Sequence, residues 1–524
     1  MKILSAQEMA AADRRSVEAG ISISELMANA GHAVAEFVRE QFPERRNIVV
    51  LAGKGNNGGD GMVAAAELAE GYGDVRIALL GRASELKGEA LAAWENAGEA
   101  AKIEVENIDD LLEALEDADL IVDAVVGTGF KPPLRGMAAM ARDLVNELPL
   151  PVLAVDLPSG WSADSLEEKT PEAFRADAVV TFAAPKLAHV FGHLTAPEVF
   201  APVVVAQIGT PSDAIVSEAK LSWTGESKAI TEKPRDINSN KGRFGHVLIV
   251  GGAYGKAGAP SMASLAALRA GAGLVTAAVE REILPLVAGI APELMMAPLD
   301  LSTTSFDALT KGITVAGVGP GLGTSDEAKA FVERFVSEVD LPMVLDADAL
   351  NIVAGRLSLL KEAVDAGKAK GKPRTIVLTP HPGEMGRLAG LTVKEVEADR
   401  VGLARKFATE NGVTLVLKGW RTLVAHPDGR IAVNTTGNPS MAKGGSGDIL
   451  TGIVAAMVGQ FPERVAEAVE AAVYLHGLAG DFACRAQDEH TVLATDTATH
   501  LCEAFQSRSV DGGGVTWITG LAAR

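Results

Sequence analysis

Two series of short apolar segments, each separated from the next by a helix-like segment, constrain the fold of this 524-residue chain more than any other feature. The first series reads NIVVLAG, VRIALLG, ADLIVDAVVG, LPVLAVDLP and ADAVVTFAAP, and the second reads GHVLIVGG, GLVTAAV, ITVAGVG, PMVLDAD, RTIVLTP, VTLVLKG and RTLVAHP. Strands of this composition that alternate with helices are typical of parallel sheets covered on both faces. We therefore predict an α/β protein made of two three-layer αβα domains.

A polar stretch between about residues 208 and 240 separates the two series. It contains two prolines and many Ser, Thr and Lys residues, and the apolar periodicity fades there. We therefore predict a first domain over residues 1–212, a linker over 213–236 and a second domain over 237–524. Ahead of the first series, Ser5 and Glu8 have the spacing of a capping box at the start of a helix.

The charge and composition exclude several classes of partner. A formal charge of -20 opposes the phosphate neutralisation on which nucleic-acid binding rests, so we expect no nucleic acid and no anionic membrane surface. The only two cysteines, Cys484 and Cys502, are too few to staple a secreted fold, which favours a reducing compartment. The N-terminus lacks a signal-peptide pattern, and no stretch reaches the roughly 20 apolar residues of a membrane span. We expect a cytoplasmic protein.

The segment GKGNNGGDG lies between the first apolar run and a helix. Glycines allow a ligand to approach the backbone, and a helix N-terminus presents free N–H groups to an anion. The spacing matches neither the Walker A pattern nor GxGxxG, and a tight connection is the simplest alternative. However, Asn56, Asn57 and Asp60 form a polar cluster that a plain turn does not need.

Two later strand ends carry similar groups. Asp123 precedes Gly127-Thr128-Gly129, and Asp156 precedes Ser159. Either aspartate alone would be read as a turn or capping residue. Because the carboxyl ends of parallel strands form the ligand crevice of open α/β sheets, their joint occurrence favours a single binding site.

The motifs LMANAG, GKGNNGGDG, DAVVGTGF and VDLPSG, in this order, resemble the NAD(P)H-hydrate epimerase family of the YjeF N-terminal type, over about residues 1–210. The resemblance implies a Rossmann-like domain that interconverts the R and S forms of NAD(P)HX, the reduced nicotinamide dinucleotide hydrated at C6. It implies a potassium ion held by Asn57, Asp123 and Ser159. It also implies substrate contacts from Asn56, Asn57, Gly58, Gly59, Asp60, Gly127, Thr128, Gly129, Phe130, Lys131, Pro132, Pro133 and Asp156.

The C6 carbon of this substrate is a hemiaminal, so epimerisation needs only reversible loss and return of the oxygen. We expect Asp156 to transfer the proton in that step. The chain departs from the family where SLEEKT follows SGWSAD, in place of a common glycine.

The segment NPSMAKGGSGDILTG has the parts that phosphoryl transfer requires. Gly444, Gly445, Ser446 and Gly447 leave amides free at a helix start, where the dipole favours negative charge. Asp448, in the first turn, can accept a proton from an attacking hydroxyl. The alternative is that Ser446 and Asp448 only cap the helix.

This loop resembles the ribokinase-like superfamily, and further motifs resemble its ADP-dependent NAD(P)H-hydrate dehydratase family, over about residues 235–505. The motifs are KGRFGHVLIVGGAYGKAGAPSMASLAALRAGAGLVTAA, APELM, GVGPGLG, DADALN, LTPHPGEMGRL, LVLKGWRT and YLHGLAGD. The resemblance implies dinucleotide contacts from Ala253, Gly321, His381 and Asp448. It also implies that ADP, with Mg²⁺, is bound by Lys418, Gly419, Trp420, Arg421, Thr422, Gly444, Gly445, Ser446 and Gly447.

His381 has a second interpretation, as a strand-end histidine satisfied by a hydrogen bond. The chain departs from the dehydratase pattern at Asn240-Lys241, where His-Lys is common, and at Lys443, where Thr or Ala is frequent.

Together these observations predict a bifunctional repair enzyme. The first domain would equilibrate the two epimers, and the second would dehydrate the S form at the expense of ADP, with Asp448 as the base. A vitamin or sugar kinase that releases a phosphorylated product is an alternative for the second domain. A non-catalytic nucleotide-binding or partner-binding module is an alternative for the first. We expect a homo-oligomer, since families of this kind commonly assemble.

Overall fold

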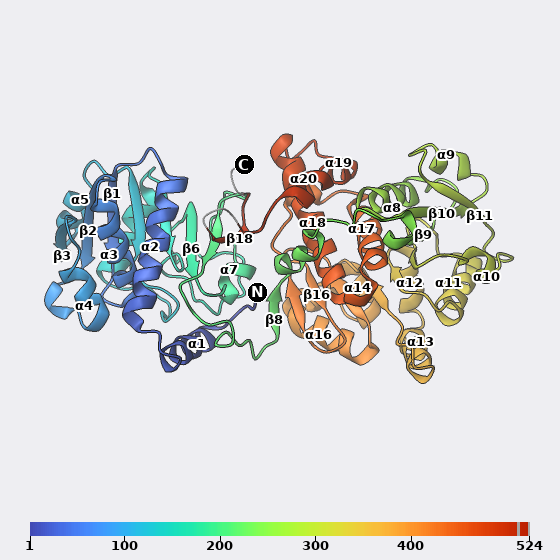
Figure 1. The fold of residues 1–524 in the computed structure, drawn as a ribbon, viewed down its shortest axis with the longest axis horizontal. Helices are drawn as coiled ribbons and strands as arrows, with labels where there is room; N and C mark the ends of the chain where they lie inside the picture. The colour runs from blue at the N-terminus through green and yellow to red at the C-terminus, as the bar shows by residue number, and fades with distance from the viewer. Residues whose placement is uncertain (511–513, 522–524) are drawn as a thin grey trace. The chain divides into compact units, whose positions relative to one another are not determined.

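The computed structural model describes residues 1–510 and 514–521 and divides the chain into two compact units. Unit 1 comprises Met1–Leu221 together with the described residues from Arg508 onward, and unit 2 comprises Ser222–Ser507 (Figure 1). The division falls inside the polar stretch identified in the sequence. The predicted limits of 213–236 for a linker and 237–524 for the second domain differ from this division at both ends.

The sheet of unit 1 has eight strands in the order β18-β7-β6-β5-β4-β1-β2-β3. Its strands are β1 (Asn47–Ala52), β2 (Asp74–Leu80), β3 (Ala101–Val105), β4 (Leu120–Ala124), β5 (Val152–Val155), β6 (Ala178–Phe182), β7 (Val203–Ala206) and β18 (Thr516–Thr519). The pairs from β3 to β7 are parallel, with Val50 opposite both Ile77 and Val122, while β18 is antiparallel to β7. The chain order reverses next to β1, so the ends of β1 and β4 flank a crevice.

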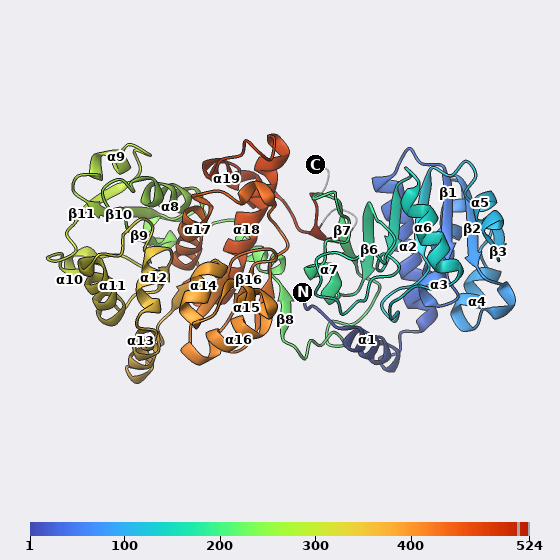
Figure 2. The same cartoon turned by 180° about the vertical axis from the view of Figure 1, so that it is seen from behind.

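Helices cover both faces of this sheet. They are α1 (Ala6–Glu18), α2 (Ile23–Gln41), α3 (Asn56–Ala69), α4 (Gly88–Glu95), α5 (Ile108–Ala114), α6 (Met137–Glu147) and α7 (Leu187–Phe191). The buried apolar side chains of α2, α3 and α4 form one core with the sheet, and those of α5 and α6 form another on its opposite face. Accordingly, α2 lies in front of the sheet in Figure 1 and α6 lies in front of it in Figure 2. Unit 1 is therefore a three-layer αβα domain, as predicted.

The sheet of unit 2 has ten strands in the order β11-β10-β9-β12-β13-β14-β15-β16-β17-β8. They are β9 (His246–Val250), β10 (Leu274–Glu280), β11 (Met295–Leu299), β12 (Val315–Val318), β13 (Met343–Leu345), β14 (Ile376–Leu378), β15 (Thr414–Leu417), β16 (Leu423–Ala425), β17 (Ile431–Val433) and β8 (Leu221–Trp223). The pairs from β11 to β15 are parallel, and β16 and β17 add antiparallel strands at one side.

Most helices of unit 2 connect successive strands, and the last four follow the final strand. Those between strands are α8 (Gly258–Arg269), α9 (Leu284–Ala288), α10 (Phe306–Leu309), α11 (Asp326–Glu338), α12 (Asp348–Ala354), α13 (Ser358–Ala369), α14 (Pro382–Ala389), α15 (Val393–Ala398) and α16 (Arg400–Asn411). The later ones are α17 (Ser446–Gln460), α18 (Val465–Ala486), α19 (Ala494–Thr499) and α20 (Leu501–Gln506). Helix α17 is buried from Ile449 to Val458 against α8, α18 and the central strands.

Two contacts explain why the predicted domain limits differ from the observed ones. The strand β18, close to the C-terminus, pairs with the edge strand β7 and so returns the chain to unit 1. In the predicted linker, Lys228 is fully buried and donates to the carbonyl of Ser507, which fixes residues 224–231 in unit 2. Polar composition therefore marked the junction but did not give its limits.

The predicted capping box at the first helix is confirmed, since Glu8 N donates to Ser5 Oγ and Ser5 N donates to Glu8 Oε2. Within the described residues no helix is both long enough and apolar enough to cross a bilayer.

We expect the packing of α17 on α8 to depend on Gly452. A β-carbon at this position would lie 2.0 Å from the carbonyl oxygen of Ala263 in α8. Gly452→Ala should therefore lower the free energy of unfolding by about 1–3 kcal/mol, because the backbones must separate. Denaturant unfolding measures the change, with Gly258→Ala in the first turn of α8 as control, since a β-carbon there meets nothing within 4 Å. Equal stability of the two variants would contradict the close approach.

Candidate functional sites

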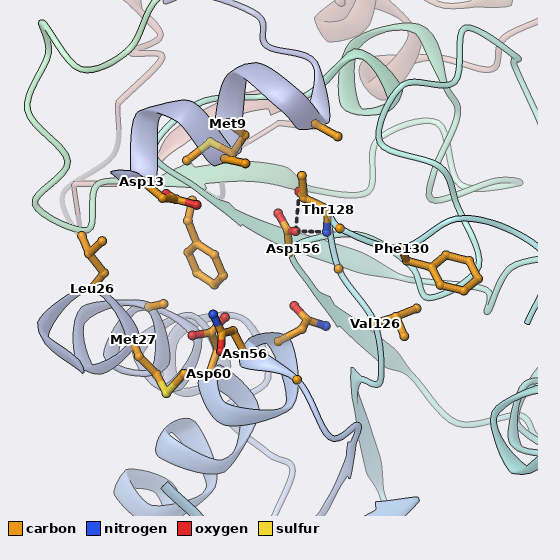
Figure 3. Close-up of a pocket in the computed structure, with 18 of the residues that line it drawn as sticks. Met9, Asp13, Leu26, Met27, Asn56, Asp60, Val126, Thr128, Phe130 and Asp156 are labelled. Carbon is orange, nitrogen blue, oxygen red and sulfur yellow. Dashed lines mark hydrogen bonds between the residues drawn. The ribbon is translucent and has the colours of Figure 1, made fainter. Parts of the chain in front are cut away.

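A cavity of about 600 Å³ opens in unit 1 where β1, β4 and β5 end (Figure 3). Its floor is made by the start of α3 and the segment after β4, and residues of α1 and α2 close another side. The predicted site residues that line it are Asn56, Asn57, Asp60, Gly127, Thr128, Gly129, Phe130 and Asp156. The prediction that three separate motifs converge on one crevice agrees with this geometry.

Five other predicted contacts do not line this cavity. Gly58 and Gly59 are buried in the first turn of α3, where their β-carbons would lie 2.0 Å from Gly53 O and 2.6 Å from Met27 Cε. Both glycines therefore allow α3 to pack closely. The segment Lys131, Pro132 and Pro133 follows Phe130 on the exposed surface.

Asp156 is held by hydrogen bonds from three directions. Its Oδ2 accepts from Thr128 N and Thr128 Oγ1, both at 2.7 Å, as the dashed lines of Figure 3 show. Its Oδ1 accepts from Lys186 Nζ at 2.9 Å and from Thr181 Oγ1 at 2.8 Å. Its backbone has a φ of 65°, which is uncommon for a residue other than glycine and is characteristic of functional sites.

The surroundings of Asp156 favour its ionised form. Burial alone would raise the pKa of Asp156, but the positive charge of Lys186, the ring of His189 and the hydrogen bonds from Thr128 outweigh burial and hold the pKa well below its usual range. Burial, together with the charge of Lys186, lowers the pKa of His189 to about 4. The geometry therefore favours a fixed anion at Asp156 over a proton carrier.

Asp123, Ser159 and Asn57 provide oxygen atoms beside this cavity. Asp123 is fully buried and accepts from Ser159 N at 2.7 Å and from Ser159 Oγ at 2.6 Å, and burial raises its pKa to about 6. Both polar side-chain atoms of Asn57 are buried without a hydrogen-bond partner in the described part of the chain. An orphaned amide and a buried carboxylate suit a hard monovalent cation, so these residues fit the potassium ion implied by the sequence.

In unit 2, the N-terminus of α17 has no side-chain cap. Its N-cap residue is Gly445, with a φ of 98°, and Ser446 Oγ donates instead to the carbonyl of Met441 at 2.7 Å. Side-chain hydrogen bonds from Ser446 and Asp448 therefore do not cap this helix, contrary to the alternative interpretation. Ser446 N donates to Lys443 O at 3.4 Å, whereas no side chain in the described part of the chain caps the amides of Gly447 and Asp448, as an anion site requires.

The loop before α17 is fixed by a buried carboxylate. Asp481 of α18 accepts from Gly437 N and from Asn438 Nδ2 at 2.9–3.1 Å. Asn438 in turn caps the short 3-10 helix Pro439–Met441. The loop from Gly437 to Gly445 is thus held at its beginning by Asp481 and at its end by α17.

An ion pair between a partly exposed lysine and a buried aspartate lies beside this helix start. Lys418 Nζ is 3.1 Å from Asp346 Oδ1 and 3.8 Å from Glu384 Oε2, and Thr451 Oγ1 donates to Asp346 Oδ2 at 2.7 Å. A β-carbon on Gly447 would lie 3.2 Å from Lys418 Nζ, so the lysine and the glycine loop are in close contact.

Asp448 has the pKa that a base acting near neutrality needs. Burial raises the pKa of Asp448 to about 7, and the nearby carboxylates of Asp346, Asp348 and Glu384 add to this effect while Lys418 opposes it. A proton acceptor works best when its pKa lies near the operating pH.

The remaining predicted residues of unit 2 lie at the ends of its strands. Ala253 N donates to Gly321 O at 2.7 Å, so these two residues, from segments after β9 and β12, are in direct contact. His381 is half exposed and caps α14 through Nδ1, which accepts from Gly383 N at 3.0 Å. The alternative interpretation, in which His381 is a strand-end histidine satisfied by a hydrogen bond, therefore applies to Nδ1, one of its two ring nitrogens.

The predicted adenine-nucleotide segment, Lys418–Thr422, connects β15 to β16. Arg400 of α16 donates to the carbonyls of Leu417 and Lys418 at 3.3 Å and also to that of Trp420. The guanidinium of Arg421 is buried, donates to Thr435 O at 2.8 Å and lies 4.1 Å from the Trp420 ring centroid. Trp420 itself is 41% exposed and so can meet a ligand.

The carboxylates of unit 2 can be compared with the way Mg²⁺ is usually bound together with a nucleotide. The residues described contain no group of three or more His, Cys, Asp or Glu side chains arranged to bind a metal ion. Mg²⁺ commonly keeps several waters and uses one or two carboxylates plus phosphate oxygens. The carboxylates around Lys418 fit that mode, with the phosphates completing the coordination.

Comparisons with known proteins agree with this division. The sequence pattern of the family described as NAD(P)H-hydrate dehydratase matches residues 247–507, and that of the YjeF-related protein N-terminus matches residues 23–188. Proteins named bifunctional NAD(P)H-hydrate repair enzyme Nnr are similar along almost the whole chain. The one from Moorella thermoacetica is 38% identical, covering 95% of each chain, and the one from Escherichia coli is 37% identical, covering 91% of this chain and 88% of its own.

This chain belongs to the family of bifunctional NAD(P)H-hydrate repair enzymes. The family and the fold class predicted from the motifs are thus confirmed. Among solved structures, an ADP/ATP-dependent NAD(P)H-hydrate dehydratase from Bacillus subtilis, co-crystallised with ATP and Mg²⁺, is 30% identical with a TM-score of 0.48, covering 55% of this chain and 99% of its own.

Several residues of the repair-enzyme cavity were not predicted from the sequence. Lys186 and Thr181 hold Asp156, and Asp13 of α1 lines the cavity although it lies outside the matched residues 23–188. Lys186 directly follows an apolar strand, which is the signal that could have revealed it. Asp13 stands in an amphipathic helix where a charged residue is ordinary, so no such signal existed.

We expect the repair enzyme to depend on Lys186 for the stability of unit 1. Lys186→Met leaves the buried carboxylate of Asp156 uncompensated, which should cost about 3–5 kcal/mol of unfolding free energy. Calorimetric unfolding measures the loss, and Lys131→Met on the exposed surface is the control. Combining Lys186→Met with Asp156→Asn should restore part of the loss; no loss in Lys186→Met would contradict the ion pair.

Proposed function

We propose that the two units perform successive steps of nicotinamide nucleotide repair. Unit 1 interconverts the R and S epimers of NAD(P)HX, and unit 2 converts the S epimer to NAD(P)H with ADP, releasing AMP and phosphate. The observation that carries this proposal is the pairing, at one helix start, of uncapped amides with an aspartate whose pKa is about 7. A dehydratase without an epimerase would leave the R form unrepaired.

In unit 2, Asp448 accepts the proton of the C6 hydroxyl. The hydroxyl oxygen then attacks the terminal phosphorus of ADP, and AMP departs. The lone pair of the ring nitrogen next expels phosphate from C6, and loss of the C5 proton restores the reduced ring. Hydroxide is a poor leaving group and phosphate is a good one, so phosphorylation is what makes the elimination possible.

The other residues of unit 2 position and stabilise the nucleotide. The segment Gly444 to Gly447, at the uncapped start of α17, binds the phosphoryl group as it moves, where the helix dipole favours negative charge. Lys418 keeps its charge because Asp346 and Glu384 raise its pKa, although burial opposes them. The segment Lys418–Thr422 binds the adenine nucleotide, and Ala253, Gly321 and His381 face the dinucleotide. Mg²⁺ would supply charge neutralisation of the phosphates when bound.

In unit 1, the residues around the cavity hold the nicotinamide half of the substrate. Loss of hydroxide from C6 leaves a cationic ring, and the ionised carboxylate of Asp156 stabilises such a cation. A potassium ion at Asn57, Asp123 and Ser159 would fix the loops after β4 and β5. Cytoplasmic location and homo-oligomer formation remain predictions.

Asp448→Asn should abolish dehydration and leave epimerisation unchanged. The amide cannot accept the hydroxyl proton, and general-base catalysis is worth about 10²–10⁴ in rate. Recovery of NADH absorbance with ADP measures the first activity, and chromatographic separation of the epimers measures the second. Asp326→Asn, also in a helix first turn but with a 94% exposed side chain, is the control. Equal loss of both activities in Asp448→Asn would contradict the division of labour.

The dehydration rate should also depend on the ionisation of Asp448. The base must be deprotonated, so kcat/KM should rise as the pH increases toward about 7 and level off above it. A profile measured over this range that is flat, or that falls, would exclude Asp448 as the group that accepts the proton.

A further inference from the structure

Helix α1 brings a carboxylate into the cavity of unit 1 that neither matched sequence pattern includes. Ala6, Met9, Ala10 and Asp13 line the cavity, whereas the match to the epimerase-type family begins at residue 23. In Figure 3 the side chains of Met9 and Asp13 come from this helix, and that of Asp60 comes from α3.

The position of α1 is fixed by contacts to three distant segments. Ala6 N donates to Asp164 Oδ1 at 2.7 Å, Glu8 Oε1 accepts from Glu218 N, and Arg15 Nε donates to Ala214 O at 2.8 Å. These contacts also give a role to the loop around Asp164, where the sequence departs from the epimerase pattern. A helix anchored in this way holds Asp13 at one place in the cavity wall.

Three carboxylates and two lysines line this cavity, and one of the lysines, Lys54, pairs with Glu85 Oε1 at 3.2 Å. Asp156 has its charge compensated by Lys186 Nζ at 2.9 Å, which is buried. Within the described residues, no ion pair holds Asp13 or Asp60. Lys186, Asp156 and Arg14 act on Asp13, and Asp156, Asp13 and Lys186 act on Asp60. Burial raises the pKa of Asp13, and it raises that of Asp60 strongly.

The geometry thus separates the carboxylates into two kinds. Asp156 accepts four hydrogen bonds and stays an anion, while Asp13 lines the α1 side of the cavity, is reached by solvent there and so can exchange a proton with a ligand. Pairs of carboxyl groups that their environments drive to opposite protonation states are typical of acid–base catalysis.

We propose that Asp13 is a catalytic residue of the epimerase, which gives a proton to the departing C6 hydroxyl and takes it back when water returns. This inference rests on the proposed function of unit 1 and reassigns the proton transfer that the sequence placed on Asp156.

The step balances without a further reactant. The carboxylic acid of Asp13 transfers its proton to the C6 oxygen, the C6–O bond breaks with its electron pair, and water departs. The lone pair of the ring nitrogen forms the C=N bond of a cation that faces the carboxylate of Asp156. Water then adds to C6 from either face, and its proton passes to the Asp13 carboxylate, which regenerates the acid and yields either epimer.

The test uses the full-length protein and purified R or S epimer of hydrated NADH. Asp13→Asn should lower kcat for epimerisation by about 100-fold or more, with KM changed by less than about threefold, since the amide fills the same space but carries no exchangeable acid proton. Asp13→Glu, which keeps a carboxyl group, should restore part of kcat. Glu18→Gln, on the exposed end of the same helix, is the matched control and should epimerise like the wild type.

Dehydration of the S epimer by unit 2 is measured in the same samples and should be unchanged in every variant, which shows that unit 2 is folded. The unchanged KM and the partial recovery in Asp13→Glu show that unit 1 is folded. An Asp13→Asn rate close to the wild-type rate would overturn the proposal. So would a 100-fold loss in Asp60→Asn with none in Asp13→Asn, because Asp60 would then be the acid. If the wild-type protein itself fails to interconvert the epimers, the proposed function of unit 1 fails instead.

Discussion

In both units, a lysine pairs with a buried aspartate that follows a central parallel strand, and the rest of each site depends on this pair. Lys186 lies 2.9 Å from Asp156 after β5, and Lys418 lies 3.1 Å from Asp346 after β13. Replacing such a pair by apolar residues often costs no stability. The presence of the pair here is therefore better explained by its electrostatic effect on the neighbouring carboxyl groups. In unit 1 the pair keeps Asp156 ionised, and in both sites burial is the main influence on the pKa of the nearby carboxyl groups of Asp13, Asp60 and Asp448.

Beside each pair lie acidic groups whose pKa is raised. In unit 2 the pKa of Asp448 is raised to about 7, and in unit 1 burial raises the pKa of Asp13 and of Asp60. The two reactions use the same feature of the substrate, the oxygen on C6. In one, that oxygen leaves as water and returns. In the other, phosphorylation at the start of α17 converts that oxygen into a good leaving group.

The interior of both sheets could be predicted from the sequence because buried parallel strands are continuous apolar runs. The edges could not: β3 reads AKIEV and is largely exposed, and β18 has its partner β7 more than 300 residues earlier. Pairing at that distance leaves no local pattern, which is why the second domain was extended to residue 524.

The site residues follow the same rule. Residues within contiguous motifs, such as Asn56, Thr128 and Asp448, were predicted because glycines and polar groups interrupt an apolar pattern. Asp13 and Lys186 contribute one side chain each from ordinary helical or strand-end contexts, and only the fold brings them to Asp156.

The product analysis that tests the account most directly is ³¹P NMR of the full-length protein supplied with ADP, Mg²⁺ and the R epimer alone. The account predicts one AMP and one inorganic phosphate for each reduced dinucleotide formed, with the R epimer consumed completely. A stable phosphoester, or an R epimer that persists while ADP is available, would contradict it.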